Sequence, residues 1–222
     1  MKEGTGDVIH DKFQNKKHYV IFAVSFLSLK RMWYMTLPAV HIDRWPFFNM
    51  LFSAVEVAKT ECVGWLWGSL PTASRKYYRI VNAAQLGNIK KRLNSGIIIN
   101  NRGITQTDNL INALPSFKYP RMGGFHSHVE WGSVLPPMHL SPTDIRFMID
   151  WEKKIEIIIG VMKKRKRVLW HRQTDGSVCG SVGNDFFHLC AYTLIESEGE
   201  QYPLLLPIVA PTSLRFLRKS SY

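Results

Sequence analysis

The alternation of apolar and polar positions divides the chain into many short strands and a few helices. Between Asp43 and Lys59, apolar residues recur three and four positions apart, which predicts an amphipathic helix with Asp43 as its N-cap. Apolar runs of strand length predict strands at 36–42, 62–67, 77–82, 96–100, 123–128, 156–162, 167–171 and 204–209. Strands and helices interspersed in this way, without an internal repeat, predict a single mixed α/β domain.

The remaining segments are expected to be connections or elements of uncertain type. Residues 129–140, which contain Pro136 and Pro137, and the Gly- and Ser-rich residues 172–184 predict loops. Residues 89–93 fit a helical turn or a loop, 107–114 fit a helix that Pro115 ends, and 185–196 fit either a strand or a short helix.

The two ends of the chain differ from its middle. Residues 1–17 are polar, and the apolar run at 19–29 predicts a strand, because 11 residues fall short of the roughly 20 that span a bilayer. No stable insertion into a membrane is therefore expected. We divide the sequence into an N-terminal extension at 1–34, a domain at 35–212 and a basic tail at 213–222 that is expected to be frayed.

Composition and charge narrow the class of protein. Apolar residues make up 45% and charged residues 21% of the chain, which is typical of a globular protein. The net charge of +12 predicts a weak attraction to nucleic acid, an anionic membrane or an acidic protein face. Three cysteines without a CxxC pair favour a reducing, cytoplasmic setting.

The densest run of positively charged residues is Lys163 to Arg167. The structural interpretation is the solvated tip of a hairpin between two strands. The functional interpretation is contact with an acidic partner or weakly with nucleic acid, although no aromatic residues are interleaved for stacking on bases.

Two histidines and an aspartate offer the strongest chemical signal. His126 and His128 stand two apart on an expected strand, so their side chains point to the same face. Ser141 is a good N-cap, Pro142 suits the first helical position, and Asp144 follows in the first turn, where it can approach that face. Two imidazoles and a carboxylate are three ligands of the kind that a catalytic zinc takes while one position stays open for water.

Glu61 completes this set. It stands at the mouth of the apolar strand expected at 62–67, separate from the three ligands. Each part alone has an ordinary structural explanation: a histidine pair within a core, a well-capped helix start, and a solvated carboxylate at a strand end. Together they supply the ligands and the independent general base that a metal hydrolase needs.

These residues resemble the motif of the JAMM (MPN+) zinc metallopeptidases, the family of the JAB/MPN-type domain. That motif places a Glu ahead of an apolar, Gly-bearing strand, then His-x-His-Pro, then Ser-x-x-Asp. Here the matching parts are Glu61, His126-Ser127-His128 and Ser141-Pro142-Thr143-Asp144, and the resemblance covers roughly residues 35 to 165. It implies a central mixed β-sheet flanked by helices, similar to that of the cytidine deaminases.

The resemblance also implies a role for each residue. His126, His128 and Asp144 would bind one Zn²⁺ per chain, and Glu61 would take a proton from the attacking water and pass it to the leaving amine. Ser141 would donate a hydrogen bond to the oxyanion. The implied reaction is hydrolysis of a peptide or isopeptide bond in a protein substrate, for instance one conjugated to a ubiquitin-like modifier.

The chain departs from the family pattern after the second histidine. Val129 stands where the family usually has Pro, and twelve residues rather than seven separate His128 from Ser141. Insertions in loops cost little closure entropy, so the ligands can still converge. The extra residues, including Glu130, Trp131 and His139, are expected beside the metal, where Glu130 could compete as a ligand.

Two other hypotheses therefore stay open. One is an inactive MPN-type scaffold, in which the altered loop leaves a domain that only binds partners. The other is a basic protein associated with nucleic acid, in which the metal site is secondary.

Overall fold

The structure is a computed structural model that describes residues 37–57, 60–87, 89–93, 96–99, 105–106, 109–110, 113–114, 119–130, 135–163 and 166–219. A compact unit runs from Pro38 to Tyr222. The expected extension at 1–34, with its strand at 19–29, lies outside the described residues. Half of the helix expected at 107–114 does so too, and of its described residues 109, 110 and 113 are helical. In the part of the chain that is described, no helix is long and apolar enough to cross a membrane.

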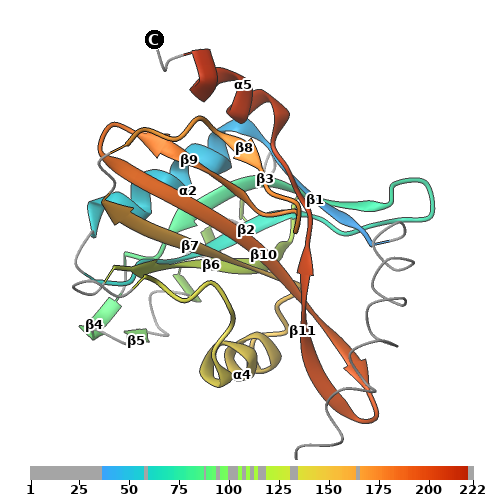
Figure 1. The fold of residues 1–222 in the computed structure, drawn as a ribbon. Coiled ribbons are helices and arrows are strands. Elements are labelled where there is room, and N and C mark those ends of the chain that lie inside the picture. Colours follow the sequence, from blue (N-terminus) through green and yellow to red (C-terminus); the bar gives the residue numbers. More distant parts are fainter. Residues whose placement is uncertain are drawn as a thin grey trace, which may run out of the picture. The chain divides into compact units, whose positions relative to one another are not determined.

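Most of this unit is a ten-stranded sheet in the order β12-β1-β3-β2-β6-β7-β10-β9-β8, with β11 paired to β10 (Figure 1). The strands are β1 (Ala39–Ile42), β2 (Val63–Ser69), β3 (Tyr77–Gln85), β6 (Arg121–Val129), β7 (Ile155–Lys163), β8 (His171–Arg172), β9 (Val178–Val182), β10 (Asp185–Ser197), β11 (Glu200–Leu206) and β12 (Ile208–Val209). The pairs β1·β12, β1·β3 and β6·β7 are parallel, and the others are antiparallel. The predicted mixed α/β class with a mixed sheet is confirmed.

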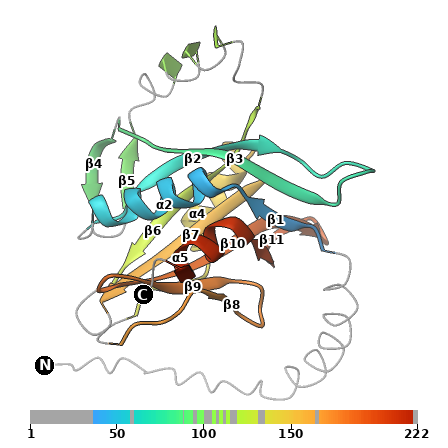
Figure 2. The ribbon, with the colours of Figure 1, turned by 90° about the horizontal axis from the view of Figure 1, so that it is seen from above.

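Helices lie against both faces of the sheet (Figures 1 and 2). Helix α2 (Arg44–Glu56) contributes Phe47 to the largest core cluster, which also includes Phe125 of β6 and Leu217 of α5 (Pro211–Lys219). Helix α4 (Pro142–Asp150) packs Phe147 against Trp65 on the other face. Because side chains alternate along β6, Phe125 points toward α2 while His126 points toward the α4 side.

The two ends of the sheet are joined. Ile208 of β12 donates a backbone hydrogen bond of 2.9 Å to the carbonyl of Gly176, in the turn that leads into β9. From α5, the Arg218 guanidinium donates a 2.6 Å hydrogen bond to the carbonyl of Trp170, just before β8. The sheet therefore curls into a nearly closed, barrel-like layer.

Several sequence-based expectations about local structure are wrong. Residues 89–93, expected to be a turn or loop, form strand β4 (Ile89–Leu93), which pairs with β5 (Gly96–Ile99) in a separate hairpin. The expected loop at 172–184 contains β9, where Gly180 is required because a Cβ there would lie 2.4 Å from the Trp170 ring. A glycine that makes room for a tryptophan cannot be distinguished from a loop glycine by composition.

The two basic segments also differ from expectation. Strands β7 and β8 are not neighbours, because β10 and β9 lie between them, so the basic run from Lys163 to Arg167 does not join a hairpin. The tail expected to be frayed forms α5 as far as Lys219, since Ser213 and Leu217 are buried.

Asp43 occupies the N-cap position of α2, but its carboxylate pairs with Arg79 at 3.0 Å instead of capping the helix.

Candidate metal centre

Strands β2 and β6 place the predicted site residues side by side. Their antiparallel register sets Val63 opposite His126. Continued beyond the strand end, it places Cys62 opposite Ser127 one step on and Glu61 opposite His128 two steps on. Two hydrogen bonds hold this end of the pairing: the Ser127 N–H donates to the Cys62 carbonyl at 3.0 Å, and the Cys62 N–H donates to Ser127 Oγ at 2.9 Å. Cys62 itself points into the α2 core, as predicted, and is fully buried.

The three predicted ligands converge. One ligand atom from each of His126, His128 and Asp144 can be chosen so that all lie within 4.8 Å of one another. The two Nε2 atoms are 3.1 Å apart, and Asp144 Oδ1 is 3.6 Å from His126 Nε2. Two nitrogens bound to one tetrahedral zinc at about 2.0–2.1 Å would be separated by about 3.3 Å. The donor set and its spacing therefore fit a zinc ion.

The outer nitrogens of both rings show which way the lone pairs point. His126 Nδ1 lies 2.8 Å from Glu156 Oε1, and His128 Nδ1 contacts the carbonyl oxygen of Pro137. Both partners are acceptors, so we assign the ring protons to the two Nδ1 atoms. The two Nε2 lone pairs then face each other, an arrangement that only a cation between them, or a proton on one of them, makes favourable.

A buried ion pair supports His126 from behind. Glu156 Oε2 lies 2.7 Å from Lys153 Nζ, and both side chains are almost fully buried. Burial favours a higher pKa for Glu156, but Lys153 and His126 outweigh it and hold the pKa of the carboxyl below its usual value. An ionised carboxylate on the outer nitrogen of a metal-binding histidine fixes its tautomer and orientation.

The same ion pair affects the protonation of His126. Burial lowers the pKa of this imidazole, yet the hydrogen bond and charge of Glu156 raise it above its usual value. The position between the two Nε2 atoms thus favours one positive charge, whether it is carried by a proton or a metal ion.

The long loop after β6 supports His128. The carbonyl of Pro137 accepts a hydrogen bond from the His128 imidazole. The next carbonyl, that of Met138, accepts one from the Tyr192 hydroxyl and so attaches the loop to β10. The Met138 sulfur also lies where Gly160 of β7 would carry a Cβ, 2.5 Å from that position. Burial lowers the pKa of His128, which favours the neutral form that binds metal.

Helix α4 presents Asp144 through a capping box. Ser141 donates its backbone N–H at 2.8 Å and its hydroxyl at 2.7 Å to Asp144 Oδ2, and the Asp144 N–H donates to Ser141 Oγ at 3.2 Å. Burial favours a higher pKa for Asp144, but His126 and Ser141 lower it overall. Oδ1 is left facing the histidines, so the cap that starts the helix also orients the ligand.

Glu61 stands in the same electrostatic environment without being one of the three ligands. Burial is the largest effect on its carboxyl and raises the pKa. The positive charge of His126 lowers this pKa, and the negative charge of Asp144 raises it. A half-buried carboxyl with a raised pKa, next to a possible metal site, has the properties of a general base.

Three residues of the inserted loop were expected beside the metal, and the structure describes two of them. Glu130 accepts a hydrogen bond from the Lys163 N–H at 3.1 Å and is not among the three converging residues. His139 is exposed, yet its charge adds to burial in lowering the pKa of His128, so it lies near the site as expected; Trp131 lies outside the described residues.

Sequence reasoning missed the supporting residues Glu156, Lys153, Ser127 and Tyr192. Only Glu156 left a signal, as a single charge within an apolar strand (Ile-Glu-Ile-Ile-Ile) that had to be buried and therefore paired.

Comparisons with known proteins add no assignment. No protein-family model matches the chain, and no curated protein matches it. Among solved structures, the solution structure of protein DSY2949 from Desulfitobacterium hafniense is similar at 13% sequence identity and a TM-score of 0.49, over 77% of this chain and 93% of that one. A likeness at this level supports no argument about function.

Proposed function

We propose that the chain is a zinc-dependent peptidase of the JAMM type, built on a JAB/MPN-type domain, which hydrolyses a peptide or isopeptide bond. The observation that carries the proposal is the approach of the two Nε2 atoms to 3.1 Å, with Asp144 Oδ1 beside them. A structural histidine pair needs no further acceptor at its inner nitrogens, whereas here Asp144 Oδ1 lies 3.6 Å from His126 Nε2 and both outer nitrogens already have acceptors of their own.

The residues around this centre divide the catalytic work. Zinc held by His126, His128 and Asp144 would lower the pKa of a water molecule and polarise the scissile carbonyl. Glu61, with its raised pKa, would take a proton from the attacking water and deliver it to the leaving nitrogen. The side chain of Asp144 is 23% exposed, so this edge of the site is open to solvent and to an extended substrate.

Ser141 would have two roles in turn. In this structure its hydroxyl donates a hydrogen bond to Asp144 Oδ2. To stabilise an oxyanion, the hydroxyl has to rotate away from the Asp144 carboxylate. The carboxylate then still accepts the hydrogen bond from the Ser141 backbone N–H. The N-terminus of α4 already favours negative charge there.

The substrate class comes from the family resemblance. It favours a protein or peptide substrate, for instance one joined to a ubiquitin-like modifier through its C-terminus. We expect the protein to act in the cytoplasm and to hold one Zn²⁺ per chain.

Metal content and hydrolysis together test this proposal. The purified chain should hold one zinc, which His126→Ala combined with His128→Ala should abolish. Glu61→Gln should keep the zinc but lower hydrolysis of a panel of peptide and isopeptide substrates by at least about 100-fold. Glu130→Gln, a nearby carboxylate outside the site, is the matched control and should retain both properties.

A partner-binding scaffold is the second candidate. The observation that favours it is the twelve-residue loop between His128 and Ser141, attached to the site through Pro137. If zinc is bound but the wild type and Glu61→Gln are equally inert on the whole panel, the scaffold is correct and the peptidase proposal fails.

A further inference from the structure

The outer face of α2 is unusually apolar for a helix at a protein surface. Trp45 and Phe52 are each 65% exposed and Val55 is 39% exposed, while Phe47 and Met50 on the inner face belong to the core. Single exposed apolar residues are common, but a helix that is apolar on both faces is normally covered on both.

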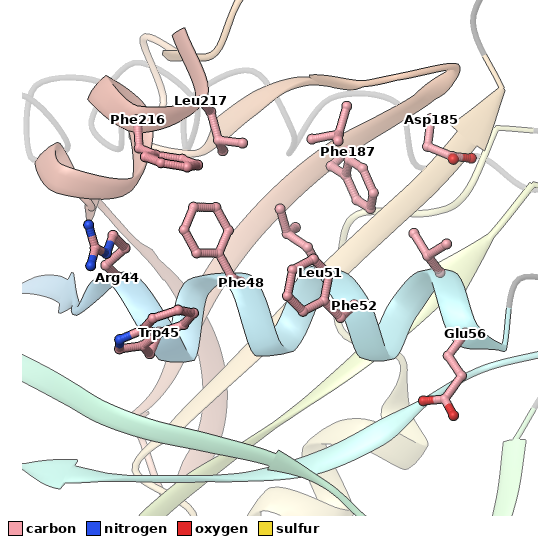
Figure 3. A pocket seen from close by; sticks show the side chains of 12 residues that line it. Arg44, Trp45, Phe48, Leu51, Phe52, Glu56, Asp185, Phe187, Phe216 and Leu217 are labelled. Atoms are coloured by element: carbon pink, nitrogen blue, oxygen red, sulfur yellow. The ribbon is translucent and has the colours of Figure 1, made fainter. Parts of the chain in front are cut away.

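These side chains border a groove of about 730 Å³ between α2, α5 and the β9–β10 turn. Figure 3 shows Phe48 of α2, Phe187 of β10 and Phe216 of α5 directed into it from separate elements. Phe48 is buried and Phe216 is half exposed, at 49%. The groove thus has an apolar floor and an accessible aromatic wall, which suits a hydrophobic helix rather than a polar ligand.

The spacing of the apolar residues on α2 indicates what kind of helix would fit. Residues 45, 48, 52 and 55 follow one another at intervals of three, four and three, which is the spacing of the a and d positions in a coiled coil. A helix with this seam is matched by another helix that has the same seam.

The charges at the ends of α2 indicate the orientation. Arg44 is the first residue of the helix and Glu56 the last, and Figure 3 shows them at opposite ends of the groove. Two copies of α2 packed antiparallel would bring Arg44 of each copy next to Glu56 of the other, whereas a parallel arrangement would place like charges together. The surface is therefore complementary to itself about a two-fold axis.

We propose that this groove is a homodimer interface, in which the α2 helix of a second copy of the chain packs antiparallel on α2, so that Trp45 of each copy lies against Val55 of the other. The sheet separates α2 from the α4 side, where His126 points, so the metal centre of each copy stays accessible in the dimer. This inference stands independently of the proposed peptidase activity.

Sedimentation or light scattering over a range of concentrations tests the interface. The full-length chain should form dimers. Phe52→Glu, or Trp45→Lys, should raise the dissociation constant at least about 30-fold, because each replaces an aromatic residue of the proposed seam by a charge. Both positions are exposed, so the fold should persist, as an unchanged circular dichroism spectrum and an unchanged midpoint of urea denaturation would show. Ile149→Glu, at a 48% exposed position on α4, is the matched control and should leave dimerisation unchanged.

Charge reversal tests the antiparallel orientation. Arg44→Glu and Glu56→Arg should each weaken self-association several-fold, because every copy then meets a like charge. An equimolar mixture of the two variants should associate as tightly as the wild type, since Glu56 of the first variant pairs with Arg44 of the second and the two substituted residues pair with each other. A wild-type chain that stays monomeric up to its solubility limit overturns the proposal, as does dimerisation that Phe52→Glu leaves intact or a mixture that fails to recover.

Discussion

The hydroxyl of Ser127 accepts the backbone N–H of Cys62 at 2.9 Å, and this buried hydrogen bond couples the strand that ends in Glu61 to the strand that carries both histidines. Ser127 points away from its two histidine neighbours and is itself fully buried. The residue between the two ligands therefore fixes the position of the proposed general base rather than that of the metal.

Replacing Ser127 by alanine should separate these two functions. The Cys62 N–H would lose this acceptor within the core, so the free energy of unfolding should fall by about 1–3 kcal/mol. Zinc affinity should change little, whereas hydrolysis should fall because Glu61 is less firmly placed. Ser181→Ala removes an equivalent buried acceptor, that of the Val168 N–H, far from the site, and should lower stability without affecting hydrolysis. Wild-type hydrolysis by Ser127→Ala would show that this bond does not position Glu61.

The Lys153–Glu156 pair should control both stability and metal affinity, but by different routes. Either Glu156→Gln or Lys153→Met leaves a buried charge without its partner and should cost about 3–5 kcal/mol of unfolding free energy in the metal-free protein. Glu156→Gln should also weaken zinc binding about 10–100-fold, because His126 loses its carboxylate.

The double variant Lys153→Met with Glu156→Gln distinguishes the two routes. It should regain much of the stability, measured by urea denaturation, while zinc affinity, measured by competition with a chelator, stays low. Recovery of zinc affinity together with stability would mean that Glu156 acts on the metal site only through folding.

The parts of this molecule that the sequence predicts are those encoded locally. The strand with His126 and His128 and the capped helix with Asp144 follow from periodicities and cap preferences within about ten residues, and both lie as expected. Strand β9 was missed because Gly180 makes room for the Trp170 ring, a packing requirement that no alternation of apolar and polar residues reveals. The contact between His128 and Pro137 was missed for a similar reason, since no local pattern specifies which loop carbonyl meets the ring.

Tyr192 should matter for the metal although it lies outside the ligand set. Its hydroxyl holds the Met138 carbonyl, next to Pro137, so Tyr192→Phe should loosen the support of His128. We expect a stability loss of about 1 kcal/mol and a several-fold drop in zinc affinity. Tyr202→Phe, a half-exposed position on β11, should leave both unchanged. Equal zinc affinity in Tyr192→Phe and the wild type would mean that the loop does not support His128.

Acid should destabilise the metal-free protein partly through His188 of β10. Burial lowers the pKa of this imidazole despite the nearby negative charge of Asp175, and its Nε2 lies 2.8 Å from Ser177 Oγ. The folded pKa is thus below the unfolded value of about 6.5, so both states are neutral at higher pH and the unfolded chain takes up a proton first as the pH falls. The contribution of His188 should be lost progressively from about pH 6.5 down to its folded pKa.

His188→Gln should make the loss of unfolding free energy between about pH 7 and pH 5 less steep, as urea denaturation at each pH would show. The other shifted histidines, His41, His126 and His128, titrate in both proteins, so the difference in slope isolates His188. Ser177→Ala is the matched control: it removes the hydrogen bond and should lower stability at every pH, but it keeps the imidazole and hence the slope. Because burial is the largest cause of the shift, a slope that His188→Gln leaves as steep as in the wild type would show that the imidazole is hydrated in the folded protein.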